Sequence, residues 1–185
     1  MRMTTGPGAP RIVIEAQMLV RLVTAVGMVA AALALALTAL VLGMRAHSPI
    51  ARNALRRFNR RFGNPRQMKT AGTPGAYAGI VRHVGRRSGR RYETPVVPCA
   101  VTGGFVIALP YGASADWVQN VLAAGLATVV TEGQTYEVER PEVVPITDVI
   151  TAFPAGARRN LRLFHVDEAL RVARAQQCAV TPATG

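Results

Sequence analysis

The chain has 185 residues, enough for one ordinary domain and a short additional segment. Its formal net charge is +12, yet sixteen basic residues and one acid precede Tyr92, whereas six basic and nine acidic residues follow it. A nucleic-acid binder carries a basic face with interleaved aromatic residues across its folded domain, so this one-sided distribution argues against nucleic acid as a partner. Cys99 and Cys178 show no metal-ligand or CxxC spacing.

A transmembrane helix is predicted over residues 22–44, after an N-terminal tail over residues 1–21. The segment from Leu22 to Met44 contains no charged residue, and as a helix it would extend about 35 Å, enough to cross a bilayer core. A cleaved signal peptide would have a shorter apolar region and a small-residue cleavage site. More arginines follow the segment than precede it, which predicts a single-pass cell-membrane protein whose C-terminal domain faces the cytoplasm.

Residues 45–75 are predicted to form a basic amphipathic juxtamembrane segment and a linker. Ala51, Leu55, Phe58 and Phe62 recur at helical spacing, with arginines between them. Such a helix is expected to contact anionic membrane lipids, and the alternative is an ordinary surface helix packed on the domain. Prolines and glycines from residue 63 to 75 indicate an irregular connection.

The remaining chain, residues 76–176, is predicted to form a small, mostly antiparallel barrel, followed by a flexible tail over 177–185. Pro95 and Pro98 place the second strand at an edge or a bulge. Ser114 is expected to cap a helix inserted midway, closed by Gly125. Strands are expected over 76–84, 92–101, 105–109, 126–131 and 135–140, an extended segment over 141–146, and helices over 115–124, from 147 or 148, and over 167–176.

Several common cofactor-binding and catalytic motifs are absent from the sequence. It has no GxGxxG motif after a strand, no Walker loop, no HExxH motif and no nucleophile elbow. The three histidines, His47, His83 and His165, are isolated from one another, so no metal site is expected, and His83 is interpreted as structural. An enzyme of this composition would depend on a cofactor for its reactivity.

Two features point to a ligand. The loop from Gly85 to Arg91 carries four arginines and Ser88, which suits an anion. The bend Pro110-Tyr111-Gly112 leads into a helix that begins near Trp117, which suits a flat, uncharged group. Two simpler interpretations stay open: Trp117 could close the barrel end, and Arg90 and Arg91 could form a solvated turn.

The run from His83 to Gly89, then Thr94 to Val96, Ala108 to Gly112 and Asp116 to Asn120, resembles the deazaflavin-dependent nitroreductase family of actinobacteria. The resemblance covers about residues 76–144. It implies a split β-barrel related to flavin-mononucleotide-binding oxidoreductases, and it implies the coenzyme F-420, which has a flat deazaflavin ring, a phosphodiester and an oligoglutamate tail.

The resemblance also implies the site residues. The basic loop would hold the anionic portion of the coenzyme, the next strand would line its ring, and the bend and helix start would complete the site. The corresponding residues are Arg86, Arg87 and Ser88; Tyr92, Glu93, Thr94, Pro95, Val96 and Val97; Ala108, Leu109, Pro110 and Tyr111; and Asp116, Trp117, Val118, Gln119 and Asn120. Some relatives have other residues at the positions of Tyr92 and Val97. Aromatic residues that cover the substrate late in the sequence of some relatives are not clearly matched here, where Ala155 and Gly156 follow Phe153 and Pro154.

The predicted function is a membrane-anchored oxidoreductase that transfers hydride from reduced F-420 to an acceptor. Quinones are attractive acceptors because an anchor would hold the site near lipid-soluble molecules, and nitro compounds would be adventitious ones. The proton would come from solvent or from Tyr111. Two alternatives stay open: a non-catalytic module that sequesters a deazaflavin or flavin at the membrane, and the same fold using flavin mononucleotide.

Overall fold

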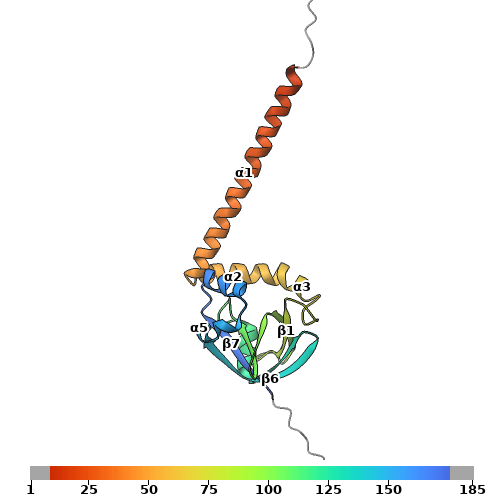
Figure 1. Cartoon of the computed structure of the whole chain (residues 1–185), viewed down its shortest axis with the longest axis vertical. Helices are drawn as coiled ribbons and strands as arrows, with labels where there is room; N and C mark the ends of the chain where they lie inside the picture. Colours follow the sequence, from red (N-terminus) through yellow and green to blue (C-terminus); the bar gives the residue numbers. More distant parts are fainter. Residues whose placement is uncertain (1–8, 176–185) are drawn as a thin grey trace, which may run out of the picture. The chain divides into compact units, whose positions relative to one another are not determined.

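The computed structural model describes residues 9–175, and side chains from residue 15 onward (Figure 1). The chain divides into two units, residues 1–42 and 43–185, and each is described by itself. The first eight residues of the predicted N-terminal tail, the predicted flexible tail over 177–185 and Cys178 lie outside the described residues.

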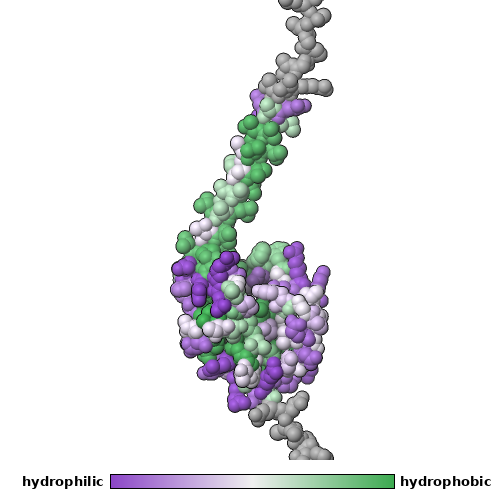
Figure 2. All heavy atoms as spheres, in the orientation of Figure 1, coloured by the Kyte–Doolittle hydropathy of each residue, from purple (hydrophilic) through white to green (hydrophobic). Residues whose placement is uncertain are grey.

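Helix α1, Ala9–Arg45, is longer than the helix predicted over 22–44. It begins earlier because Pro10 lies in its first turn, where proline is tolerated, and no proline follows until Pro49. Within it, Glu15–Arg45 is the one helix of the described residues that is long and apolar enough to cross a membrane. Apolar side chains cover most of this helix in Figure 2.

Three consecutive helical segments follow in the second unit. They are α2 (Pro49–Phe58), the π-helix η1 (Asn59–Gly63) and α3 (Asn64–Gln67). Phe58, Gly63 and Asn64, the residues at their junctions, keep right-handed helical backbone angles, so the chain stays helical through both changes. The amphipathic helix is therefore present as predicted, and it continues into the segment that was expected to be an irregular connection.

A seven-stranded antiparallel sheet forms the barrel of this unit, with the order β2-β1-β5-β6-β7-β4-β3. Its strands are β1 (Gly79–Val84), β2 (Arg91–Val96), β3 (Pro98–Val101), β4 (Gly104–Ala108), β5 (Leu126–Thr131), β6 (Gln134–Pro145) and β7 (Glu168–Arg174). The expected mostly β fold, a split β-barrel, is confirmed.

The two edges of the sheet come from one stretch of chain. Strands β2 and β3 lie at opposite ends of the strand order, yet only Val97 separates them in sequence. The sheet must therefore curl until its edges nearly meet, and its strands are visibly curved in Figure 1. The edge position predicted from Pro95 and Pro98 is confirmed, although the predicted single strand is two.

Helix α4, Asp116–Ala124, packs into the barrel core. Its Val118 and Val121 are fully buried in a cluster with Phe105 of β4 and Leu170 of β7. A second apolar cluster lies under α5 (Ile146–Val149), the 3-10 helix η2 (Ile150–Ala152) and α6 (Ala155–Leu163). A helix was predicted to begin at residue 147 or 148, but α6 was not predicted. The barrel thus fixes the start of α4, where the candidate site lies.

Two local predictions were wrong. The segment predicted as a helix over 167–176 contains strand β7, which pairs with both β4 and β6. Its Leu170 and Val172 are buried on the core side, and ladder hydrogen bonds on both edges outweigh the helix propensity of its alanines and arginines. Ser114 does not cap α4: the N-cap is Ala115, and no side chain caps it.

Candidate functional site

The basic loop is a tight turn between β1 and β2. The backbone N–H of Gly85 donates to the Arg90 carbonyl oxygen at 2.8 Å, and that of Gly89 donates to the Gly85 carbonyl oxygen at 2.8 Å. Gly89 has a φ of 64°, which favours glycine. A Cβ on Gly85 would lie 2.6 Å from Ser88 Oγ and 2.7 Å from the Tyr92 ring, so a larger residue there would displace these two side chains.

The side chain of Asn120, in α4, holds this loop by hydrogen bonds to Arg86. Its Oδ1 accepts hydrogen bonds from the backbone N–H of Arg86 at 3.1 Å and from Arg86 Nη1 at 2.9 Å. Its Nδ2 contacts His83 Nδ1 at 3.2 Å. Asn120 and His83 are the buried polar residues of the described chain. The loop, strand β1 and helix α4 are therefore joined by one amide.

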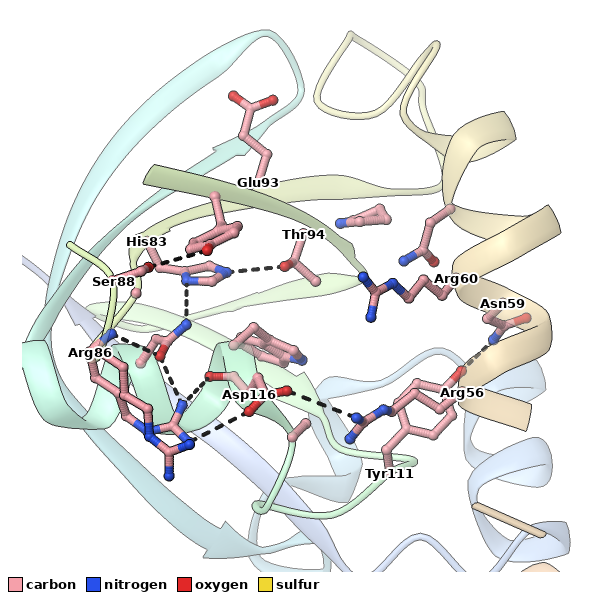
Figure 3. A pocket seen from close by; sticks show the side chains of 18 residues that line it. Arg56, Asn59, Arg60, His83, Arg86, Ser88, Glu93, Thr94, Tyr111 and Asp116 are labelled. Carbon is pink, nitrogen blue, oxygen red and sulfur yellow. Dashed lines mark hydrogen bonds and ion pairs between the residues drawn. The ribbon is translucent and has the colours of Figure 1, made fainter. Parts of the chain in front are cut away.

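Asp116 at the start of α4 lies between two arginines. Its carboxylate is 3.5 Å from Arg86 Nη2 and 3.9 Å from Arg56 Nη2 of helix α2. These contacts are exposed, so each contributes little to stability. They orient Arg56 and Arg86 toward the same space, as Figure 3 shows.

His83 forms the floor of this space. Its Nε2 is 3.1 Å from Thr94 Oγ1, and its ring stacks on Tyr92 with centroids 5.7 Å apart. Burial lowers the pKa of His83, which favours the neutral imidazole at neutral pH. The Tyr92 hydroxyl reaches Ser88 Oγ at 3.2 Å, so the stacked ring also supports the loop.

These groups border a cavity of about 610 Å³, here called the basic cavity (Figure 3). Four arginines line it, against two carboxylates, and one of these, Glu93, is engaged by Arg82 at 2.8 Å. Its charged and polar lining consists of Arg56, Asn59, Arg60, Asn64, His83, Arg86, Arg87, Ser88, Tyr92, Glu93, Thr94, Tyr111, Asp116, Trp117 and Asn120. The cavity is suited to an anionic ligand.

A second cavity of about 770 Å³, the apolar cavity, adjoins the first. It lies among β3, β4, the bend after β4 and helix α6, and Glu132 alone of its lining residues is charged. The two cavities share the residues Asn59, Asn64, Pro95, Tyr111, Ala115 and Trp117. A molecule in one cavity would therefore meet a molecule in the other across this common wall.

Tyr111 is the polar group of the wall. Asn59 Nδ2 of the π-helix donates a hydrogen bond to the Tyr111 hydroxyl, which leaves the hydroxyl proton available to another acceptor (Figure 3). Burial raises the pKa of Tyr111, and the hydrogen bond from Asn59 opposes this only in part. The hydroxyl stays protonated at neutral pH.

The structure brings together most of the residues predicted for the site, but it divides them between the two cavities. The basic cavity is lined by Arg86 to Ser88, Tyr92 to Thr94 and the α4 residues Asp116, Trp117 and Asn120, whereas Val96, Val97 and Ala108 to Pro110 line the apolar one. Val118 is fully buried in the core, and Gln119 Nε2 donates to the Ala113 carbonyl oxygen. These last two residues line neither cavity.

Seven residues that line the basic cavity were not among the predicted site residues: Arg56, Asn59, Arg60, Asn64, His83, Gly85 and Ala115. The first four lie three, four and eight positions along one helical face, a polar stripe that the sequence contained. Nothing in that spacing says which partner the stripe faces, and the segment had been assigned to the membrane surface. His83 was interpreted as structural, and its ring lines the cavity as well.

The sequence matches no protein-family model and no curated protein. Similar solved structures include a conserved hypothetical protein from Mycobacterium tuberculosis, with 10% identity and a TM-score of 0.42 over 55% of this chain and 75% of that one. An F-420-H2 dependent reductase has 14% identity and a TM-score of 0.37 over 52% and 93%. HutZ, a heme storage protein from Vibrio cholerae, has 11% identity and a TM-score of 0.40 over 55% and 83%.

An F-420-H2 dependent reductase is thus among the solved structures to which the chain is similar, as the sequence resemblance implied. These similarities concern the split-barrel fold alone. At these identities and TM-scores the choice of cofactor and reaction depends on the site's own residues.

Proposed function

We propose that this chain is a membrane-anchored oxidoreductase that binds reduced F-420 in the basic cavity and reduces an uncharged acceptor in the apolar cavity. The observation that carries the proposal is the pairing of these cavities. Arginines crowd one of them, the other is almost free of charge, and Tyr111 and Trp117 belong to the wall between them.

The residues of the basic cavity fit a ligand with an anionic tail. Arg86 is held by Asn120 and Asp116, so its main role is to shape the loop and to add positive potential. Arg87 of the basic loop and Arg60 of η1 line the same cavity, and their guanidiniums would hold phosphate or carboxylate groups. Trp117 and the β2 strand would lie along the flat ring. When bound, the coenzyme supplies the hydride.

The apolar cavity fits an uncharged, largely hydrophobic acceptor. Pro98 and Leu109 line it from the barrel, and Phe153 and Leu161 line it from the helical cover. A bound apolar molecule would displace water from the common wall, which protects a reduced ring from competing reactions. A quinone fits this lining, and nitro compounds would be adventitious acceptors. Tyr111, protonated and facing both cavities, would donate the proton.

The membrane anchor is α1, with the barrel in the cytoplasm because of the excess of arginines after the helix. Helix α2 and η1 would contact anionic lipids. Ile50 is 80% exposed, Phe58 60% and Phe62 48%, and the Phe58 and Phe62 rings lie 5.3 Å apart. Arg57 and Arg61 beside them would add attraction to lipid headgroups. Such exposed apolar side chains on a basic helix are typical of interfacial helices.

A titration and a turnover assay test the proposal. The full chain in detergent micelles should bind F-420, measured by its fluorescence, more tightly than flavin mononucleotide. With reduced F-420 and menaquinone, it should oxidise the coenzyme faster than a heat-inactivated control. Binding without turnover across several acceptors would instead indicate a module that sequesters the coenzyme. A flavin absorbance spectrum retained through purification would indicate flavin mononucleotide as the cofactor.

A further inference from the structure

His47, His165 and Asp167 gather at a small hollow outside both cavities of the proposed active site. His47 lies in the turn before α2, and the other two lie in the loop before β7. One ligand atom from each residue lies within 4.8 Å of the others, and the two imidazole rings are 5.4 Å apart. The sequence interpretation that the histidines are isolated was therefore wrong for His47 and His165.

The orientation of His165 is that of a metal ligand. Its Nδ1 is 3.2 Å from the backbone carbonyl oxygen of Arg45. A carbonyl oxygen only accepts, so Nδ1 carries the proton and Nε2 keeps its lone pair. Histidines that bind metals commonly donate their other ring N–H to a carbonyl or carboxylate in this way, which fixes the tautomer and the ring plane.

The spacing suits a tetrahedral ion. Donor atoms about 2.0–2.1 Å from a zinc ion lie about 3.3 Å from one another. His47 Nε2 is 3.2 Å from Asp167 Oδ2 and already fulfils this condition. The third ligand atom lies within 4.8 Å of these two, so it must move by at most about 1.5 Å, which rotation of an exposed side chain supplies.

Both histidines also hold an uncommon backbone conformation. His47 has a φ of 52° and His165 a φ of 53°, in the left-handed region that residues other than glycine seldom adopt. Residues in this region carry backbone strain, and such strain is concentrated where function requires it. In this hollow the strain falls on two of the three prospective ligands.

We propose that His47 Nε2, His165 Nε2 and the Asp167 carboxylate bind a divalent transition-metal ion such as Zn²⁺, with water at the fourth position. Imidazole and carboxylate are common zinc ligands. The ion would join the turn before α2 to the loop before β7, two segments far apart in sequence. It would act as a clip that holds α2, which carries Arg56, onto the barrel.

Arg52 competes with the ion. Its Nη2 contacts His47 Nδ1, and because a guanidinium only donates, Nδ1 accepts and His47 Nε2 carries the proton that faces Asp167. Metal binding at Nε2 transfers that proton to Nδ1, so Arg52 must withdraw. Arg52 Nε is buried without a hydrogen-bond partner among the described residues, so little hydrogen bonding holds the side chain in place.

Zinc titration of the untagged full chain in detergent micelles tests this proposal by calorimetry. One Zn²⁺ should bind per chain, and Zn²⁺ should raise the Tm of the wild type because it binds the folded state. His47→Ala and His165→Ala should each weaken binding at least tenfold and abolish the Tm shift. Arg52→Ala should tighten binding several-fold, because it removes a positive charge and releases His47 Nδ1.

Asp148→Asn, an exposed carboxylate change away from the hollow, is the matched control and should leave zinc affinity unchanged. Co²⁺ should give the visible absorption of a tetrahedral complex in the wild type and lose it in His165→Ala. Circular dichroism establishes that each variant is folded. Zinc binding that is equal in the wild type and both histidine variants, or looser in Arg52→Ala, would overturn the proposal. The result is independent of F-420 binding, which is measured separately.

Discussion

Asn120 accepts two hydrogen bonds from Arg86, one from its backbone N–H at 3.1 Å and one from its guanidinium at 2.9 Å. Because both contacts go to Oδ1, the other end of the amide must donate, and it donates to His83 Nδ1. His83 then carries its proton on Nε2 and donates to Thr94 Oγ1. One buried amide therefore sets the loop conformation and the histidine tautomer together.

Replacing Asn120 by alanine should impair stability and coenzyme binding together. The variant leaves His83 Nδ1 and the Arg86 N–H without their partner, which costs about 1–3 kcal/mol. We expect a Tm lower by about 3–10 °C in thermal unfolding of the full chain, and weaker F-420 binding in a fluorescence titration.

Gln119→Ala is the control for this change, because Gln119 lies on the same helix and lines neither cavity. Its F-420 affinity should stay within about twofold of the wild type. An Asn120→Ala variant with normal affinity would mean that the loop holds its shape without the amide.

Arg87 and Arg90 provide a matched pair within the basic loop. Arg87 lines the basic cavity and Arg90 does not, although both belong to the same short turn. Arg87→Ala should weaken F-420 binding by about 10- to 100-fold, since a hydrogen bond to a charged group contributes about 1.5–3 kcal/mol. Arg90→Ala should change the affinity less than threefold.

Titration at increasing salt concentration checks the electrostatic origin of this effect. The affinity of the wild type should fall with salt, and that of Arg87→Ala should fall less steeply. Equal losses of F-420 affinity in Arg87→Ala and Arg90→Ala would show that the loop acts only through its overall charge.

Most of the barrel was predictable because its strands show local signals. β5 and α4 have the predicted bounds within a residue, since a glycine or a turn marks each end. β7 was missed because only Leu170 and Val172 alternate with an exposed residue, Ala169 beside Leu170 is buried as well, and the neighbours favour a helix. Only pairing with β4 and β6, segments distant in sequence, decides its conformation.

The parts of the candidate site that are contiguous in sequence were predictable, whereas the parts that come together only on folding were not. Arg86, Ser88 and Trp117 follow local motifs, whereas Arg56 and Asn59 enter the site from a helix whose packing partner no local pattern specifies. The predicted single binding surface also divides into two cavities. That division depends on where the bend at Tyr111 meets Asn59, a contact across 52 positions of sequence.

Acid should destabilise the fold through His83. Burial lowers the pKa of His83 in the folded state below its ordinary value of 6.5, so the unfolded chain binds the proton more readily. The stabilising contribution of the neutral imidazole is complete above about pH 6.5 and is lost as the pH falls through the folded-state pKa. The Tm of the wild type should therefore decrease from pH 7.5 to pH 5.5.

His83→Gln tests the assignment, because a glutamine amide replaces the imidazole with a group that does not titrate. The decrease in Tm between the two pH values should be smaller in this variant than in the wild type, measured with EDTA present so that metal binding does not contribute. An identical decrease would assign the acid sensitivity to other groups.

Tyr111→Phe separates binding from proton transfer in the proposed reaction. The variant removes only the hydroxyl oxygen, so F-420 affinity should stay within about threefold of the wild type. The kcat for a quinone acceptor should fall by at least tenfold. General acid catalysis typically contributes about 10²–10⁴-fold, and proton donation by solvent would replace part of this contribution. Because burial raises the pKa of Tyr111, the wild-type rate should show no loss from tyrosine ionisation between pH 7 and pH 9.

Asn59→Ala, which removes the hydrogen-bond donor to Tyr111 and keeps the hydroxyl, should reduce kcat less than Tyr111→Phe does. A Tyr111→Phe variant with the wild-type kcat would assign the proton to solvent.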